Sequence, residues 1–168
     1  MPFVKWRRFM TGQGKGRAGF VGMLTPDLTI GASHLAAPQD LDSVLMRANT
    51  LYKDGSCLRI FATGSFAANG NNKQLDILVG TGAVNIASTG AVAGNNVNWI
   101  LEAFLWRRAT LVQETFSRFM HGLTPLAIRA VTTAFDEKVD NIIHLVGTAA
   151  TADHDILSCS LIVEAMTV

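Results

Sequence analysis

The hydrophobic pattern between residues 57 and 106 is the clearest structural signal in the chain. Three apolar runs, CLRIFATGSF, QLDILVG and NWILEAFLW, alternate in period two and are bounded by clusters of Gly and Asn. Successive side chains of a strand point to opposite faces, so this pattern indicates antiparallel strands joined by hairpins. It favours an all-β domain over the α/β folds that carry most nucleotide and redox chemistry.

The pattern continues to the C-terminal part of the chain and predicts eight strands. Turn signals recur roughly every ten residues, which is typical of a β-sandwich or barrel, and a two-sheet jelly roll is a standard way to build one. One turn contains Asn69-Gly70, the residue pair that best tolerates positive φ between two strands. The predicted strands span residues 57–67, 74–80, 83–88, 98–108, 110–118, 126–134, 141–148 and 156–166.

The first 56 residues have a different pattern. Residues 1–26 are predicted to form an extended arm, because five glycines between Gly12 and Gly22 disfavour a helix. Residues 27–168 then form the sandwich domain. Within it, LDSVLMRA at 41–48 predicts one or two helical turns capped by Asp40 or Asp42, with short strands at LTIGAS and ANTLY on either side.

Both faces of the predicted strand at 98–106 are apolar. A single sandwich core covers one face only, so the second face must lie under the N-terminal segment or under another copy of the chain. We interpret it as a homo-oligomer interface, with central strands under loops as the alternative. Trp99, Leu101, Ala103 and Leu105 share one face, and Ile100, Glu102, Phe104 and Trp106 share the other, where Ile100, Phe104 and Trp106 are the expected interface residues.

Composition supports an oligomer, and charge points to the arm. The chain is 49% hydrophobic and 16% charged, which leaves a partly apolar surface. Its net charge is +1, but five basic residues precede the first acidic one, Asp27, so the opening segment carries +5 and the remainder −4. The expected partner-binding residues of the arm are Lys5, Trp6, Arg7, Arg8, Lys15 and Arg17.

Two kinds of partner suit this arm. Aromatic and basic side chains in alternation can stack and pair on nucleic acid, or they can anchor an acidic protein surface. Five positive charges are few for nucleic-acid affinity at physiological salt. Docking onto a protein lattice is therefore favoured.

No motif predicts an enzyme, a cofactor or a metal site. GKGRAG at 14–19 matches G-x-G-x-x-G but lacks the preceding strand and following helix that hold a pyrophosphate. Ser65 and Ser33-His34 lack the context that activates a serine. DHD at 153–155 favours a hydrogen-bonded turn over a cation site. The four histidines, His34, His121, His144 and His154, have no metal-binding spacing.

Three further sequence features have structural readings. Glu102 and Glu114 could do acid–base chemistry as a pair, but the nearby Arg107, Arg108 and Arg118 favour a salt-bridged sheet face. The two cysteines, Cys57 and Cys159, are expected as buried apolar residues, with a disulfide as the less favoured alternative. The sequence shows neither a secretory signal nor an apolar run of about 18 residues, so no membrane association is expected.

The central motif resembles a known group of proteins. A strand with Gly-x-Phe-Ala-Ala-Asn-x-Asn-x-Lys is followed by a strand that ends in Gly and by a strand that starts with Trp. This run resembles the core of small jelly-roll proteins of tailed-phage virions, over roughly residues 50–168. The matching residues are Gly64, Phe66, Ala67, Ala68, Asn69, Asn71, Lys73, Gly80 and Trp99, with LSCSLIVEAM as the closing strand.

The resemblance implies a function. Such proteins decorate the head as cement proteins or form parts of the tail and fibres, so it implies a virion protein assembled in the host cytoplasm. A trimer that binds the major capsid protein or another virion protein is expected, with a tail, baseplate or receptor-binding part as the alternative. A carbohydrate-binding module is a third possibility. It is disfavoured because sugar platforms need exposed aromatic rings, and Trp99 and Trp106 lie in apolar strands.

Overall fold

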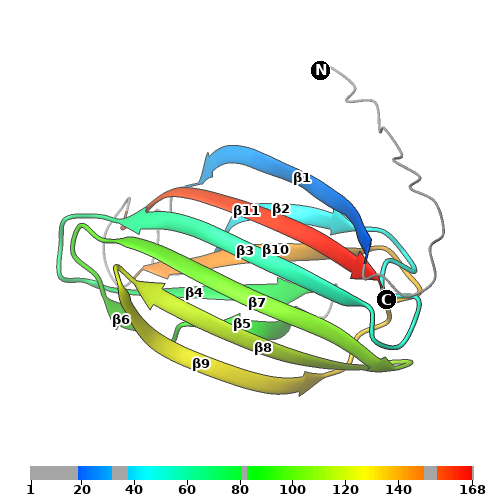
Figure 1. Cartoon of the computed structure of the whole chain (residues 1–168). Helices are drawn as coiled ribbons and strands as arrows, with labels where there is room; N and C mark the ends of the chain where they lie inside the picture. The colour runs from blue at the N-terminus through cyan, green and yellow to red at the C-terminus, as the bar shows by residue number, and fades with distance from the viewer. Residues whose placement is uncertain (1–18, 32–37, 81–82, 150–154, 168) are drawn as a thin grey trace.

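The protein consists of β-strands throughout the part of the chain that the structure describes (Figure 1). The computed structural model describes residues 19–31, 38–80, 83–149 and 155–167, and no helix occurs among them. The strands are β1 (Gly19–Gly31), β2 (Gln39–Met46), β3 (Cys57–Phe66), β4 (Asn72–Val79), β5 (Val84–Ser88), β6 (Val92–Ala93), β7 (Asn98–Ala109), β8 (Val112–His121), β9 (Thr124–Thr133), β10 (Asn141–Ala149) and β11 (Ile156–Thr167).

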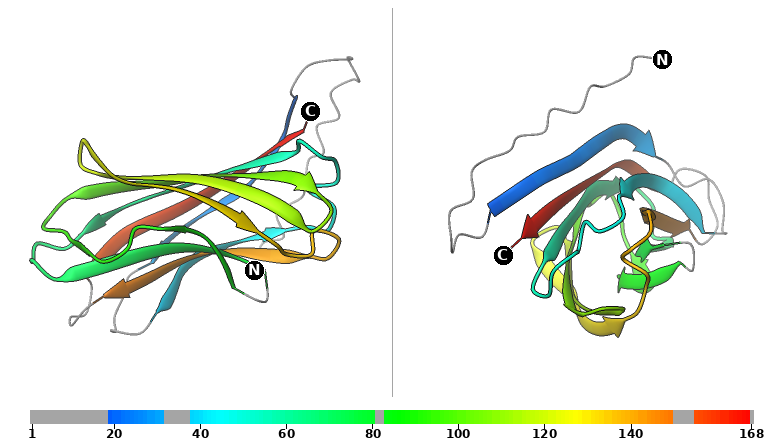
Figure 2. Two further views of the ribbon diagram at one scale, coloured as in Figure 1. Left: turned by 90° about the horizontal axis from the view of Figure 1, so that it is seen from below. Right: turned by 90° about the vertical axis from the view of Figure 1, so that its right-hand side faces the viewer.

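These strands form two antiparallel sheets that face each other. The six-stranded sheet has the order β1-β11-β3-β7-β8-β9, and the five-stranded sheet has the order β2-β10-β4-β5 with the short β6 beside β4. Figure 2 shows the two layers edge-on, with the β8–β9 hairpin extending one sheet past the edge strand of the other. The chain is therefore an all-β sandwich, as its hydrophobic pattern predicts.

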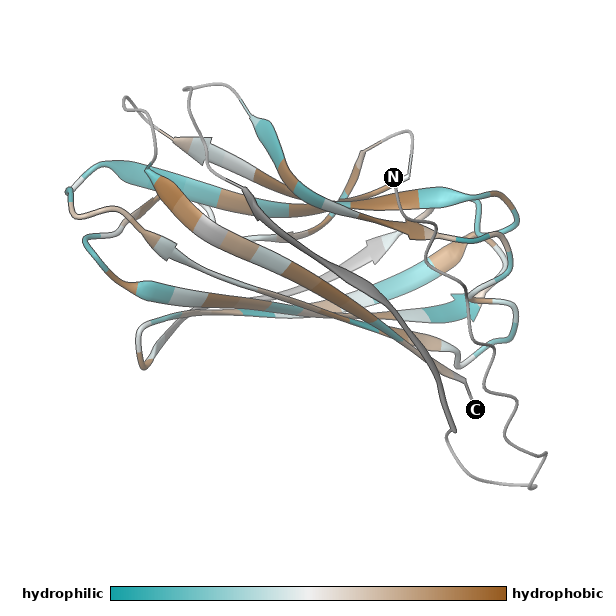
Figure 3. Cartoon of the chain, turned by 90° about the horizontal axis from the view of Figure 1, so that it is seen from above, coloured by the Kyte–Doolittle hydropathy of each residue, from teal (hydrophilic) through white to brown (hydrophobic). Residues whose placement is uncertain are grey.

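The core lies between the two sheets and follows the predicted alternation. In β7, Trp99 and Leu105 are at most 1% exposed, whereas Ile100 and Phe104 point outward and are half-buried. Figure 3 shows the resulting bands of hydrophobic and hydrophilic residues along the strands. Residues that contribute from both sheets include Leu58, Ile60, Leu75, Ile77, Val79, Ile86, Leu101, Ile143, Leu145, Leu161 and Val163.

All eight strands predicted after residue 56 are present, with bounds shifted by at most a few residues. The predicted helical turns at 41–48 are wrong, because residues 39–46 form β2 and pair with β10. The spacing of Leu41, Val44 and Leu45 fits one turn of a helix as well as a short strand, and pairing with β10 decides for the strand. Asp42 caps no helix: its Oδ2 accepts a hydrogen bond from the Leu161 backbone N–H at 2.9 Å. ANTLY is also no strand, since residues 48–51 form a turn.

The inner boundary of the predicted arm also needs correction. β1 begins at Gly19 and pairs with β11 from Gly19 opposite Thr167 onward, so residues 19–26 belong to the six-stranded sheet. Pro26 lies where the register shifts between Leu24 and Asp27. An edge strand tolerates a proline at such an irregularity, because no neighbour needs the missing N–H. The predicted arm residues, Lys5, Trp6, Arg7, Arg8, Lys15 and Arg17, lie outside the described residues.

The predicted tight turn at Asn69-Gly70 is wrong. Among the described residues, the glycines with positive φ are Gly55, Gly80, Gly90 and Gly122, and Gly70 is not one of them. Residues 67–71 form a longer connection between β3 and β4, which side-chain hydrogen bonds hold in place, as described below.

The two cysteines are free and buried, as expected for small apolar residues. Cys57 lies opposite Met166 in the pairing of β3 with β11. Cys159 is therefore seven residues away along β11, about 23 Å at the rise of a strand. That separation is far beyond the reach of a disulfide.

Candidate functional site: the outer face of the six-stranded sheet

The outer face of the six-stranded sheet, meaning the face turned away from the core, carries the predicted interface residues. Ile100, Phe104 and Trp106 all lie on it and are half-buried. The strand register places Phe104 between Arg59 of β3 and Phe116 of β8. The structure thus brings the three predicted residues together on one surface and adds aromatic groups from neighbouring strands.

Aromatic rings form a contiguous group on this face. The rings of Phe104 and Trp106 stack with centroids 5.6 Å apart and an interplanar angle of 15°. Phe116 is 37% exposed beside Phe104, and the Arg59 guanidinium carbon lies 5.6 Å from the centre of the Phe61 ring. Large rigid rings provide much contact area at low entropic cost, which is why they dominate binding surfaces.

Ion pairs are interleaved with these rings. Glu102 Oε1 accepts a hydrogen bond from Arg59 Nε at 2.8 Å, and Oε2 accepts one from Arg118 Nε at 2.6 Å. The Glu102 side chain is only 3% exposed, while those of Arg59 and Arg118 are 39% and 54% exposed. Arg59 also contacts Glu164 at 3.3 Å. The hydrogen bond to Glu102 raises the pKa of the Arg59 guanidinium, so this group keeps its charge.

The predicted salt-bridged sheet face is thus confirmed. Glu102 pairs with Arg118, and Glu114 pairs with Arg108 at 2.6 Å. Arg107 instead lies at the end of the sandwich with Glu137. Within the network of Arg59, Glu102, Arg118 and Glu164, two positive and two negative charges balance. A partner that covers this face would therefore not bury an unpaired charge. Burial of an unpaired charge is the main energetic cost of a polar interface.

A hollow of about 470 Å³ lies on the outer face of the five-stranded sheet. Its floor is apolar and includes Leu45 and Ile142, which are 41% and 42% exposed. At its rim, His144 Nδ1 lies 2.9 Å from Asp40 Oδ2. None of the described residues that line it is Phe, Tyr or Trp. The hollow therefore lacks the stacking platform that a sugar site needs.

Of the histidines considered for chemistry, the structure describes His121 and His144. The His121 ring packs against the rings of Phe66 and Phe119, at 5.9 and 6.4 Å between centroids. His34, His154, Ser33 and Asp153 lie outside the described residues. Where the structure describes the chain, no three His, Cys, Asp or Glu side chains gather in a group that could hold a metal ion. The same part of the chain contains no helix long and apolar enough to cross a membrane.

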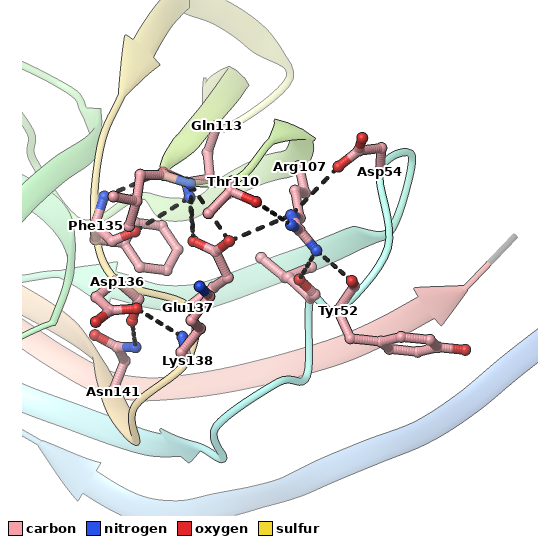
Figure 4. Close-up of polar contacts among 12 residues, drawn as sticks. Tyr52, Asp54, Arg107, Thr110, Gln113, Phe135, Asp136, Glu137, Lys138 and Asn141 are labelled. Atoms are coloured by element: carbon pink, nitrogen blue, oxygen red, sulfur yellow. Dashed lines mark hydrogen bonds and ion pairs between the residues drawn. The ribbon is translucent and has the colours of Figure 1, made fainter.

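Sequence reasoning missed two buried polar clusters, one at each end of the sandwich. The first, here called the arginine cluster, joins Arg107 and Glu137 to the loop at 51–54 (Figure 4). Arg107 Nε lies 3.3 Å from Glu137 Oε1 and 3.4 Å from Asp54 Oδ1. Its Nη1 donates to the carbonyls of Leu51 and Tyr52. Glu137, 2% exposed, also accepts a hydrogen bond from Gln113 Nε2 at 3.1 Å.

The second, here called the lysine cluster, consists of Lys73, Asn69, Asn71, Gly94 and Asp155. Lys73 is 1% exposed, and its Nζ donates to Gly94 O and Asn69 Oδ1, both at 2.7 Å. Two longer contacts reach Asn71 O at 3.0 Å and Asn69 O at 3.2 Å. Asp155 is fully buried and accepts a hydrogen bond from Asn69 Nδ2 at 2.6 Å. The Asn-x-Asn-x-Lys motif was the available signal, but it could not show that Asp155 joins it.

A scan of protein-family models, a search of curated proteins and a search of solved structures found no match to the chain.

Proposed function

We propose that this protein is a phage virion structural protein that works by binding, as a homo-oligomer joined through the outer face of the six-stranded sheet. The observation that carries the proposal is the group of aromatic rings around Phe104 and Trp106, interleaved with ion pairs that are already neutralised within the chain. Such a surface is apolar enough to associate and leaves no charge unpaired when covered.

We also propose that the sandwich is a jelly roll. With the short β6 and the β8–β9 hairpin set aside, eight strands remain, and in chain order they are arranged as 1-8-3-6 in one sheet and 2-7-4-5 in the other. In this arrangement the first and last strands pair, and strands adjacent in the chain mostly lie in opposite sheets, as two interlocked Greek keys require. The strand order supports the jelly roll that the resemblance to virion proteins implies.

The particular role that we propose is a trimeric cement protein on the outside of the head. It rests on the resemblance of the central motif and on the charge of the arm. A trimer would present three copies of the basic segment that contains Lys5, Trp6, Arg7 and Arg8. Simultaneous attachment of three arms to neighbouring capsid subunits would multiply weak contacts into a durable one. A tail or baseplate position is the alternative within the same class.

The interface proposal is tested with two matched double variants. Phe104→Ser with Trp106→Ser should convert the oligomer to a folded monomer of 18.0 kDa, measured by light scattering after size exclusion. Leu45→Ser with Ile142→Ser removes apolar groups that are 41% and 42% exposed on the opposite outer face, and the oligomer should persist. Circular dichroism checks that both variants stay folded. A parent protein that is monomeric at micromolar concentration would overturn the proposal.

The virion role is tested separately. Deletion of residues 1–18, which precede β1, should leave the oligomer intact and abolish binding to heads that lack the protein. The number of copies per virion then distinguishes a head protein from a tail protein, since hundreds of copies indicate the head and a few dozen or fewer indicate the tail. If the shortened oligomer binds heads as well as the parent does, the arm has no role in attachment.

A further inference from the structure

The lysine cluster holds a nucleophile, an amide and a carboxylate in one buried group. Lys73 Nζ lies 2.7 Å from Asn69 Oδ1, one bond away from the amide carbon, Cγ. On the other side of the same amide, Asn69 Nδ2 lies 2.6 Å from Asp155 Oδ1. The exposed fractions of Lys73 and Asp155 are 1% and 0%, so water has little access to either group. The carboxamide of Asn69 is thus held between an amine and an acid–base group.

We propose that Lys73 and Asn69 join in an intramolecular isopeptide bond, with Asp155 as the catalytic acid–base residue. A proton of the Lys73 ammonium passes through the Asn69 amide, which contacts both groups, to Asp155. Nζ then attacks Cγ and the new N–C bond forms. As the Cγ–Nδ2 bond breaks, Asp155 returns this proton to Nδ2 and transfers a second proton from Nζ to the same nitrogen. Of the three ammonium protons, one stays on the new amide and two leave with the former Nδ2 as ammonium. No electrons are transferred, so no oxidant is needed.

Two observations select Asn69 over Asn71 as the amide that reacts. Lys73 Nζ contacts the side-chain oxygen of Asn69, whereas it contacts Asn71 only through the backbone carbonyl. Asn71 Nδ2 also lies farther from Asp155, at 3.3 and 3.4 Å from its two carboxylate oxygens. An acid must be close to the nitrogen that it protonates as the leaving group departs, so Asn69 is the better placed.

The surroundings favour the reactive form of the amine. Burial lowers the pKa of Lys73, an effect that the charge of Asp155 partly offsets, and the neutral amine is the nucleophile. The Phe66 ring lies 5.7 Å from Nζ and covers the cluster from the core side.

Intact mass spectrometry of the full-length folded protein tests the proposal directly. Loss of ammonia should lower the mass by about 17 Da relative to the sequence. After denaturation, trypsin should fail to cleave at the acylated Lys73, so residues 60–107 should appear as one peptide in place of 60–73. The full sequence mass, with normal cleavage after Lys73, would overturn the proposal, and this result needs no variant to fold.

Two variants and one reagent exclude other sources of the mass change. Asp155→Asn keeps the shape of the acid but cannot transfer the proton, and Lys73→Arg keeps the positive charge without a nucleophilic amine. Both should have the full sequence mass, and a deficit that persists in either variant would overturn the proposal. A succinimide at Asn69-Gly70 also loses ammonia, but hydroxylamine opens it and leaves Lys73 cleavable. If hydroxylamine removes the deficit in the parent, the proposal is wrong.

Discussion

The lysine and arginine clusters close opposite ends of one sandwich, and they do so with different chemistry. β3 runs from one to the other: the Arg107 backbone N–H donates to Ser56 O just before the strand, and Phe66 at its end faces Lys73. At the arginine end the cation contacts carboxylates directly. At the lysine end, the contacts of the cation with the described residues are to uncharged oxygens, and the carboxylate of Asp155 is reached through the amides of Asn69 and Asn71.

This difference determines how well each end tolerates the loss of one group. Without Arg107, Glu137 would keep hydrogen bonds from the Leu111 N–H and Gln113 Nε2. The Arg107 guanidinium likewise has several alternative acceptors in the loop at 51–54. In the unreacted cluster that the structure shows, a single ammonium, that of Lys73, donates to carbonyl groups from both loops. An end of the sandwich whose charged groups each have several partners should tolerate the loss of one group. An end whose carbonyl groups share a single donor should not.

The largest effect is expected from removal of the two cations. Lys73→Met keeps most of the side-chain volume but leaves buried carbonyl oxygens without a donor, so the free energy of unfolding should fall by about 3–4 kcal/mol. Arg107→Met should cost about 1–2 kcal/mol, because Glu137 keeps other donors and the loop carbonyls can turn to water. Urea unfolding followed by Trp fluorescence measures both.

If Lys73→Met and Arg107→Met lower the free energy of unfolding equally, the two ends tolerate the loss of a cation equally well. The comparison is sound only if both variants keep the parent's far-UV circular dichroism, and Arg108→Met serves as the control. Arg108 pairs with Glu114 on the surface, where its side chain is 63% exposed, so its loss should be within about 0.5 kcal/mol of zero.

A smaller effect is expected when the two carboxylates are neutralised. Asp155→Asn places an amide N–H₂ against the amides of Asn69 and Asn71 and leaves Lys73 without a counter-charge, which should cost about 2–3 kcal/mol. Glu137→Gln should cost about 1 kcal/mol, because Asp54 still forms an ion pair with Arg107 and the loop carbonyls still accept hydrogen bonds from it. Thermal unfolding ranks the two. If Glu137→Gln proves the more damaging, the arginine end is the one that depends on a single partner.

The hydrophobic pattern could predict most of the fold. In β7, for example, core-facing side chains recur at every second position, so the strand follows from the sequence; they are Trp99, Leu101, Ala103 and Leu105. β2 escaped prediction because eight residues fit both a strand and a helical turn, and only pairing with β10 decides. Of β1, only the end was predicted, as the short strand at LTIGAS. Its first part escaped prediction because glycines and a proline disfavour regular structure locally, while the free edge of β11 supplies the hydrogen bonds.

The candidate site was predictable only in part. Ile100, Phe104 and Trp106 follow from one strand's alternation, but their neighbours Phe61 and Phe116 depend on the order of strands in the sheet. The polar clusters depend on contacts across long stretches of sequence, such as the 86 residues between Asn69 and Asp155. A local sequence pattern does not identify which distant carboxylate will lie beside a buried lysine.

Glycine substitutions probe how tightly the lysine end is packed. A Cβ at Gly94 would lie 2.2 Å from Phe66 Cδ2, and that ring is held by Trp99 and His121, at 6.0 and 5.9 Å between centroids. Gly94→Ala should therefore cost about 1–3 kcal/mol. Gly70→Ala, between Asn69 and Asn71, is the matched control, because no described atom lies within 4 Å of its Cβ and its φ is not positive. It should change stability by less than about 0.5 kcal/mol in urea unfolding. If Gly94→Ala and Gly70→Ala lose similar stability, the loop, and not the Phe66 ring, opposes the added methyl group.

The last prediction concerns the two buried thiols, Cys57 and Cys159. Desolvation raises the pKa of Cys57 from 9.0 to about 11, and it raises that of Cys159, helped by the charge of Asp42, to about 12. The native state therefore keeps protons that the unfolded chain releases above pH 9.0, so stability should fall as the pH rises from there toward the native pKa values. Urea unfolding at about pH 8 and about pH 10 should show a larger loss for the parent than for the double variant Cys57→Ala, Cys159→Ala. Other alkaline groups are common to both proteins and cancel in the difference. If the parent and the double variant lose the same stability between the two pH values, the thiols have ordinary pKa values and water reaches both ends of the core.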